Sequence, residues 1–297
     1  MKPAPFEYYA PTTIEQALTH LAEHGYDAKL LAGGQSLIPT MNFRLAQPEV
    51  LIDLNNISDL NYIRPDESGG LSLGAMTRHA QVEADALVAQ RAPLVAETMP
   101  KIGTSQIRNR GTFGGSIAHA DPAAELPAVS VALDGRFKLR SQKGARWVSA
   151  KDFFIGLFTT LLEVDELLVE VAIPALPPRT GWAIEEVARR PHDFALVGVV
   201  AVVTLDDRNV CQGARIVFLS VGDGPVEARQ GADVLMGEVM TSESIRAAAE
   251  TAASVDIDPS SDIHASADFR RHLSGVLARR ALERANERAN GNGRLDK

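Results

Sequence analysis

The stretch Asn109–Glu125 reads N-R-G-T-F-G-G-S-I-A-H-A-D-P-A-A-E, and the interpretation of the whole chain starts from it. It holds three glycines, two hydroxyl residues and two carboxylates within seventeen positions. The adjacent Gly114 and Gly115 have no Cβ and tolerate positive φ, so a ligand can lie against the backbone and meet its N–H groups. This composition suits the binding of a pyrophosphate.

A second glycine pair lies in Leu30–Pro39, which reads L-L-A-G-G-Q-S-L-I-P. The apolar run Ala28–Ala32 predicts a strand, and Gln35–Met41 predicts the opening of a helix. A strand, a glycine turn and a helix start form an anion-binding arrangement, because free N–H groups point at the turn. Two such loops in one chain suggest the two sides of one ligand.

The polar residues of both loops have two interpretations. In the first, Ser36, Thr112 and Ser116 donate to phosphate oxygens, while Asp121 and Glu125 accept from ribose or adenine groups. In the second, the glycines only make tight turns and the hydroxyls only cap helices. The occurrence of two glycine pairs in small and polar contexts favours ligand binding.

Several other site classes are excluded by spacing. Neither loop has the G-x-G-x-x-G spacing of a Rossmann fold or the Gly-Lys-Ser/Thr of a Walker A loop, and no G-x-S-x-G nucleophile elbow occurs. For His79, His119 and His192 we identify no H-x-x-x-H or H-E-x-x-H pattern anywhere in the chain, so we predict no metal site. His119 could touch the ligand or satisfy a carbonyl within its loop.

Composition limits the classes of ligand and partner that this chain can bind. With 297 residues and 45% hydrophobic content the chain can form two domains, and its formal net charge of −8 argues against nucleic-acid binding. No apolar run reaches membrane-spanning length and the amino terminus has no signal-peptide core, so we expect a soluble cytoplasmic protein. Cys211 is the single cysteine, which excludes an internal disulfide or a cysteine-ligated iron–sulfur cluster built by this chain alone. We expect a buried, inert thiol.

The residue pattern predicts an α+β chain with a proline-rich linker. A helix capped by Thr12 or Thr13 ends at Gly25, Thr77 caps a second helix, and Pro93–Ile107 is a third. Further helices are expected over 127–133, 226–235, 242–253 and 267–286. Strands are expected over 50–54, 60–63, 71–73, 136–140, 145–148, 167–173, 182–187, 196–205 and 214–221, with Asp134-Gly135 as a hairpin turn.

The expected domains follow from this pattern. We predict residues 1–176 as one domain with subdomains of about 1–57 and 58–176, residues 177–288 as a second, and residues 289–297 as a disordered tail. The apolar stripe of 267–286 is interpreted as core-facing rather than as an oligomerisation seam. The paired basic residues are either solvated or fix a loop or partner by ion pairs; the first is favoured for Arg110, and Arg189 and Arg190 are left open.

Taken together, these motifs resemble the FAD-binding medium subunits of the molybdenum hydroxylases, the carbon monoxide dehydrogenase and xanthine dehydrogenase family. The resemblance covers nearly the whole chain. It rests on P-x-x-F-x-Y-x-x-P-x-T at Pro3–Thr13, A-G-G-Q-S-L-I-P at Ala32–Pro39, Q-I-R-N-R-G-T-F-G-G-S-I-A-H-A-D-P at Gln106–Pro122 and R-R-P-H-D-F-A-L-V-G at Arg189–Gly198. It implies an FAD-binding domain of the vanillyl-alcohol oxidase (PCMH) type in two α+β subdomains, followed by a small α+β lobe with a three-stranded sheet and helices.

The resemblance also implies the cofactor-binding residues, with no catalytic residue in this chain. On one side of the FAD pyrophosphate it places Leu30, Ala32, Gly33, Gly34, Gln35, Ser36 and Leu37. On the other it places Thr112, Gly114, Gly115 and Ser116, with Ile102 nearby, Asp121 or Glu125 in the nucleotide half, and the backbone of Leu168 beside the flavin or adenine. Many relatives carry a lysine where this chain has Glu185 and Glu186. A carboxylate directed inward there would lower the flavin potential.

The partners are implied in the same way. Two [2Fe-2S] clusters and the molybdenum cofactor would sit on a small and a large partner subunit, in a dimer of heterotrimers. Electrons would pass from a partner's cluster through FAD to an external acceptor. Two alternatives remain open, namely a self-contained flavin oxidase or dehydrogenase of the same fold, and a non-enzymatic scaffold that has lost the flavin.

Overall fold

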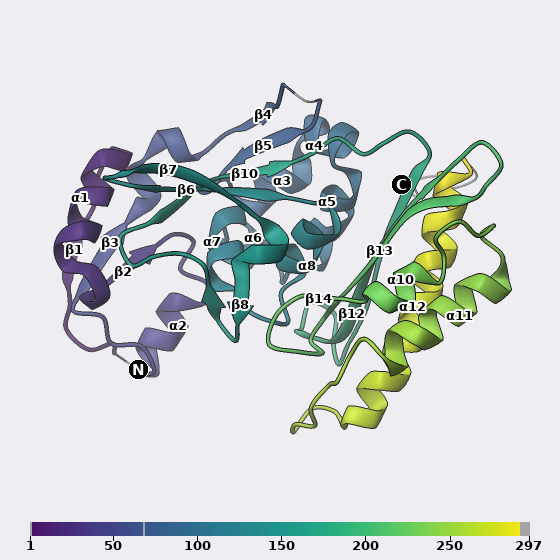
Figure 1. The fold of residues 1–297 in the computed structure, drawn as a ribbon. Helices are drawn as coiled ribbons and strands as arrows, with labels where there is room; N and C mark the ends of the chain where they lie inside the picture. The colour runs from purple at the N-terminus through teal and green to yellow at the C-terminus, as the bar shows by residue number, and fades with distance from the viewer. Residues whose placement is uncertain (1, 68, 292–297) are drawn as a thin grey trace.

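The computed structural model describes residues 2–67 and 69–291, and its strands form three main sheets that follow one another along the chain (Figure 1). The first sheet has the order β1-β3-β2, the second β4-β5-β10-β6-β7 and the third β11-β12-β13-β14. In Figure 1 they run from the purple amino-terminal end at the left to the green strands and yellow helix at the right. The predicted α+β class is confirmed.

The first sheet is parallel and small. Its strands are β1 (Glu7–Tyr9), β2 (Ala28–Leu31) and β3 (Val50–Asp53). Helix α1 (Ile14–His24) is capped by the Thr13 hydroxyl, which accepts from the Gln16 amide, and ends at Gly25, as predicted. Its buried face joins the core of this sheet. The other elements here are the 3₁₀ turn Gly25–Asp27 and helix α2 (Leu37–Asn42).

The second sheet is antiparallel throughout. Its central strand β10 (Leu167–Ile173) is buried along its whole length and is apolar except for Glu170, whose buried carboxylate pairs with Arg64 at 3.1 Å. The other strands are β4 (Ile63–Pro65), β5 (Leu71–Gly74), β6 (Arg136–Ser141) and β7 (Gly144–Ser149). The helices of this region are α3 (His79–Ala84), α4 (Ala86–Arg91), α5 (Pro93–Thr98), α6 (Ser105–Arg108), α7 (Phe113–His119), α8 (Glu125–Ala132) and α9 (Ala150–Phe153).

Short elements complete this region. They are the 3₁₀ turns Leu54–Asn56, Ser58–Leu60 and Met99–Lys101, and a hairpin of β8 (Phe154–Gly156) and β9 (Thr159–Thr160).

The third sheet is an antiparallel meander covered by helices on one face (Figure 1). The three predicted strands are β11 (Thr180–Ala188), β12 (Ala195–Leu205) and β13 (Cys211–Leu219). A fourth short strand, β14 (Val226–Glu227), forms where a helix was predicted to begin. The helices are α10 (Arg229–Asp233), α11 (Ser242–Ser254) and α12 (Ala267–Ala289).

The apolar stripe of α12 faces the core, as predicted. Leu277, Ala281 and Ala285 are buried in the core of the third sheet. A Cβ on Gly181 of β11 would lie 1.8 Å from the Ala285 carbonyl oxygen, so the helix packs directly on the strand there. The predicted tail overlaps this helix at Ala289, and its residues 292–297 lie outside the described part of the chain.

Three local predictions were wrong. Thr77 does not cap a helix; its hydroxyl binds the Tyr62 backbone, and α3 begins after Arg78. The predicted helix Pro93–Ile107 is broken into α5, a 3₁₀ turn and α6, because Pro100 lacks an amide donor and Gly103 has a φ of +49°. Asp134-Gly135 links α8 to β6, whereas the β6–β7 hairpin turns at residues 142–143.

The second and third sheets are joined by specific contacts. The Arg288 guanidinium of α12 lies 2.6 Å from the Glu97 carboxylate of α5 and donates to the Trp182 carbonyl at 2.7 Å. The Ser220 amide donates to the Pro122 carbonyl. Across residues 2–67 and 69–291, no helix is long and apolar enough to span a membrane.

Candidate functional site

The first loop, Ala32–Ser36, connects β2 to α2 and presents unpaired backbone donors. Gly34 has a φ of +72°, a conformation that favours glycine. The Ile38 amide donates to the Gly34 carbonyl at 3.1 Å, but no acceptor among the described residues pairs with the amides of Gly33, Gly34, Gln35 and Ser36. The Ser36 hydroxyl makes no cap hydrogen bond either. Consecutive free amides of this kind form an anion-binding concavity.

The second loop, Asn109–Ser116, is built differently. The Thr112 hydroxyl caps α7 by accepting from the Gly115 amide at 3.1 Å, and the Gly114 amide donates to the Ala75 carbonyl at 2.9 Å. The Ser116 amide donates to the Thr112 carbonyl. The glycines of this loop therefore allow other atoms to pack closely against the backbone, while the amides of Gly114, Gly115 and Ser116 already donate to acceptors in the protein.

The two loops touch through their backbones. A Cβ on Gly33 would lie 2.4 Å from the Arg110 carbonyl oxygen and 2.8 Å from the Gly111 Cα. A Cβ on Gly115 would lie 3.4 Å from that of Ala32. Gly33 is thus needed for the loops to meet, and the prediction that two distant loops form two sides of one surface gains a geometric basis.

Two side chains that sequence reasoning missed hold the loops together. The Asn55 amide group donates to the Ala32 carbonyl at 3.0 Å, and the Arg78 guanidinium donates both to the Asn55 side chain and to the Arg110 carbonyl. Burial is the main reason that the pKa of Arg78 is lowered, with Arg110 as a second cause. Asn55 stands in a predicted turn, but nothing local to Arg78 indicates its role.

A third group of predicted residues gathers around a buried acidic cluster. Lys101, beside the predicted Ile102, lies 3.9 Å from the Glu186 carboxylate, whose other oxygen is buried without a partner. Burial, together with the neighbouring Glu186 and Asp121 carboxylates, raises the pKa of Glu125 to about 7. Burial also raises the pKa of Glu186. Asp121 itself accepts from the Ala123 amide at 2.9 Å and shapes the turn before α8.

Glu185 and Glu186 lie beside different basic side chains. Glu185 pairs with Arg284 of α12, whereas Glu186 faces Lys101. The basic group nearest Glu186 therefore comes from another segment of the chain, at Lys101.

The remaining predicted residues lie in or next to the core. Leu168 is 4% exposed, and the neighbouring Val169 carbonyl accepts from the Ala75 amide, the residue that also pairs with Gly114. Leu30 and Ala32 pack against the core of the first sheet. Arg108 is buried and fixes the preceding segment, since it pairs with Glu83 at 2.7 Å and donates to the Gly103 carbonyl at 2.7 Å. Arg110, Arg189 and Arg190 are exposed.

His79, His119 and Cys211 behave as structural groups. His79 is buried, and burial lowers its pKa to about 4. The His119 ring lies 5.1 Å from that of Phe158, and burial lowers the pKa of His119 too. Cys211 is buried as predicted, and burial raises the pKa of its thiol.

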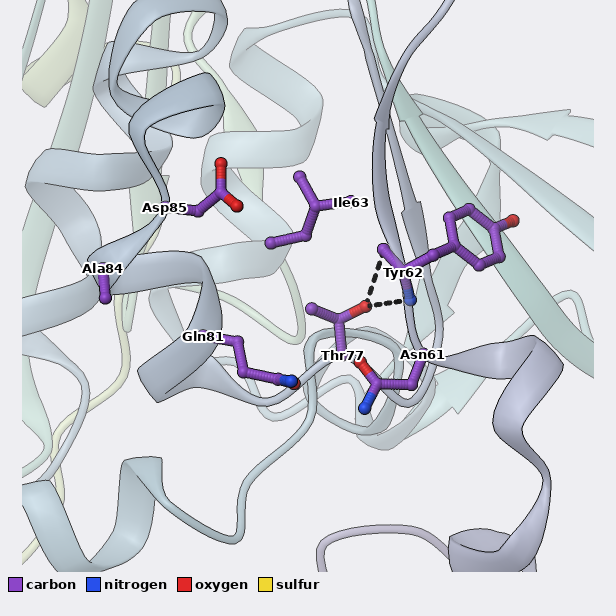
Figure 2. A pocket seen from close by; sticks show the side chains of 7 residues that line it. All are labelled: Asn61, Tyr62, Ile63, Thr77, Gln81, Ala84 and Asp85. Atoms are coloured by element: carbon purple, nitrogen blue, oxygen red, sulfur yellow. Dashed lines mark hydrogen bonds between the residues drawn. The ribbon is translucent and has the colours of Figure 1, made fainter.

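A cavity of about 430 Å³ is lined by none of the predicted site residues. Figure 2 shows its seven lining residues, with the Thr77 hydroxyl bonded to the Tyr62 backbone. The Asp85 carboxylate accepts from the first amides of α4, and the Gln81 side chain accepts from the Arg78 amide. Its polar groups therefore serve the fold.

Comparison with known proteins identifies the family. Residues 4–176 match the model of the FAD binding domain in molybdopterin dehydrogenase, and residues 182–285 match the CO dehydrogenase flavoprotein C-terminal domain. The chain belongs to the FAD-binding medium subunits of the molybdenum hydroxylases. It is a subunit of an oxidoreductase, and its cofactor is FAD.

Relatives align with this subunit along nearly their whole length. The 6-hydroxypseudooxynicotine dehydrogenase complex subunit alpha of Paenarthrobacter nicotinovorans is 39% identical, with 97% of each chain covered. The carbon monoxide dehydrogenase medium chain of Hydrogenophaga pseudoflava is 40% identical over 96% of this chain and 98% of its own. A solved structure of carbon monoxide dehydrogenase from that organism superposes with a TM-score of 0.93, at 40% identity and with the same coverage.

The two loops fit the FAD pyrophosphate chemically. The first loop offers amide donors that have no protein acceptor, which is what a phosphate oxygen requires. The second loop offers the Ser116 hydroxyl, whereas the space beside Gly114 and Gly115 is filled by Ala75 and Thr112. The family thus accounts for donors that would otherwise stay unpaired.

Proposed function

We propose that this FAD-binding subunit transfers electrons within a heterotrimeric molybdenum hydroxylase. It accepts them from [2Fe-2S] clusters on a small partner subunit and passes them to an external acceptor, while the molybdenum cofactor sits on a large partner subunit. The observation that carries the proposal is the four unpaired amides of the first loop, held against the second loop by Asn55 and Arg78.

FAD, when bound, supplies the one- and two-electron chemistry that links an iron–sulfur donor to such an acceptor. The residues of this chain bind and position it. The amides of Gly33 to Ser36, with Ser116 opposite, hold the pyrophosphate, and Thr112 keeps α7 in place through its cap. Ile102, Leu168 and the acidic residues Asp121, Glu125 and Glu186 complete the predicted contacts.

Exposed apolar side chains beside the loops support docking of a partner. Phe43 and Leu45 are 65% and 81% exposed just after α2, the helix that follows the first loop. Phe158 is 53% exposed in the β8–β9 hairpin and contacts His119 at the end of α7. Single exposed apolar residues are ordinary, but groups of them mark interaction sites. A partner on these segments would bring its cluster close to the flavin.

The domain division is part of this proposal. Residues 1–57 hold every strand of the first sheet, residues 58–176 those of the second, and residues 177–288 those of the third. The assembly into a dimer of heterotrimers and the cytoplasmic location stay predictions. The substrate is expected to be set by the large subunit, and the relatives named above carry the names of chemically different substrates.

The test is reduction of the purified chain with and without its partners. We expect the chain alone to take up FAD, shown by a flavin absorption spectrum, and to remain oxidised when substrates of related hydroxylases are added. In the reconstituted complex, the flavin absorbance should bleach on addition of the substrate. Bleaching in the isolated chain would instead establish a self-contained flavin oxidase or dehydrogenase, and a chain that takes up no FAD would refute the proposal.

A further inference from the structure

Helix α1 carries a group of metal-binding side chains that sequence reasoning passed over. His20 and His24 have H-x-x-x-H spacing, with Glu23 between them. One ligand atom from each of the three residues lies within 4.8 Å of the others, and no other such group occurs in residues 2–67 and 69–291. Residues four apart on a helix lie on one face, so the two imidazoles point the same way.

The two imidazoles have nitrogens that nothing satisfies. His20 Nδ1 and His24 Nε2 are both buried and have no hydrogen-bond partner. Buried polar atoms are normally paired, and leaving one unpaired costs about 1–3 kcal/mol. An unpaired nitrogen on each of two neighbouring imidazoles therefore points to a ligand that accepts lone pairs from both.

Strand β1 holds the rings in place. The Tyr9 ring stacks on His20, with centroids 4.2 Å apart, and lies 5.4 Å from His24. The two imidazoles are nearly parallel, at 16° and 6.3 Å. Because aromatic stacking restricts ring rotation, the ligands are partly oriented before an ion binds.

The charge around the group favours a cation. The Glu23 carboxylate lies 4.0 Å from His24 Nε2, and no Lys or Arg among the described residues pairs with it. The Glu7 carboxylate accepts from the Tyr9 hydroxyl at 3.1 Å, which adds a second negative group beside the stack.

We propose that His20, Glu23 and His24 bind a divalent transition-metal ion, with Zn²⁺ as the best match to two imidazoles and one carboxylate. Tetrahedral Zn²⁺ with bonds of 2.0–2.2 Å places its ligands about 3.4 Å apart, so small side-chain rotations from the present separations complete the site. Water fills the fourth position. The ion would hold these three side chains of α1 together beside Tyr9 of β1.

Metal titration of the tag-free full-length chain tests this site. The chain is first stripped with a chelator and dialysed, then titrated with Zn²⁺ by calorimetry and with Co²⁺ by visible absorption. We expect one equivalent of each ion to bind, with the d–d bands of a low-symmetry Co²⁺ site. The midpoint of thermal unfolding should rise with Zn²⁺, since an ion that binds only the folded state stabilises it.

Variants separate metal binding from packing. His20→Phe keeps an aromatic ring against Tyr9 but removes the nitrogen ligands, and His24→Ala and Glu23→Gln remove the other two ligands. Each should weaken Zn²⁺ binding by about tenfold or more and abolish the thermal shift. His272→Ala removes an exposed histidine of α12 and should bind as the parent chain does.

FAD uptake serves as the folding control for every variant. A parent chain that binds no stoichiometric Zn²⁺, or variants that fold and bind it with unchanged affinity, would overturn the proposal.

Discussion

Replacement of Gly33 by alanine tests the idea that the two loops must touch to form the FAD site. The new Cβ would lie 2.4 Å from the Arg110 carbonyl oxygen and 2.8 Å from the Gly111 Cα. Both are backbone atoms, so no flexible side chain can move aside, and ordinary C···O contacts begin at about 3.3 Å. The loops must therefore separate by roughly 1 Å.

The expected magnitude follows from the usual cost of overpacking. Forcing an extra methyl group into a packed region costs about 1–3 kcal/mol. If the free chain relieves this strain by opening the loops, FAD has to close them again, and binding weakens by about 5- to 150-fold. If the loops cannot open, the same cost appears as a lower free energy of unfolding.

Two measurements on the Gly33→Ala chain distinguish these outcomes. FAD affinity is obtained by titrating the FAD-free chain and following flavin fluorescence, and stability is obtained from thermal unfolding without FAD. Gly213→Ala is the matched control, since its Cβ would meet its nearest neighbour, the Thr204 side chain, only at an ordinary 3.8 Å. Wild-type affinity and wild-type stability in Gly33→Ala would refute the backbone contact between the loops.

Three further predictions concern side chains that hold the site and its surroundings. In Arg78→Lys, the lysine lacks the planar guanidinium that binds the Asn55 side chain and the Arg110 carbonyl together. FAD affinity should therefore fall roughly ten- to a hundredfold in the same titration. An affinity equal to that of the parent chain would contradict the bridging role. The pKa of Glu125 is raised from 4.5 to about 7, so its protonated form favours folding, and stability should fall as pH rises through this window. By about pH 8 the FAD-free Glu125→Gln chain should be more stable than the parent by about 3 kcal/mol in urea unfolding, and equal stability at pH 4 and pH 8 would argue against the shift. Arg288→Ala removes the Glu97 carboxylate's partner at 2.6 Å and should lower the free energy of unfolding by about 2 kcal/mol. An unchanged free energy of unfolding would show that this contact is not needed.

Local chemistry made several features predictable from the sequence. The cap at Thr13 and the stop at Gly25 define α1 because both act within one helical turn. The apolar residues of 167–173 predicted the strand β10, and the helical stripe of α12 predicted its core-facing side. The paired glycines pointed to two ligand-binding loops. The resemblance then indicated FAD, and the family comparisons confirmed it.

Predictions failed where neighbours outside the local window decided the outcome. Thr77 looked like a helix cap, but the Tyr62 backbone takes its hydroxyl from fifteen residues away. The helix predicted over Pro93–Ile107 followed apolar periodicity and overlooked the break between Pro100 and Gly103. The statement that no H-x-x-x-H pattern occurs was also wrong, because His20 and His24 have that spacing, while the absence of a metal site stays a prediction that the proposed titration tests.

The two glycine-rich loops, the three successive groups of strands and the family motifs of an FAD-binding subunit can all be recognised in the amino-acid sequence. Only the tertiary structure decided that the loops touch at Gly33, that Asn55 and Arg78 tie them together, and that Lys101 faces Glu186. The physical reason is that capping, turn and periodicity signals act over a few residues. Backbone contact, burial and charge pairing depend on residues that are distant in the chain and adjacent only after folding.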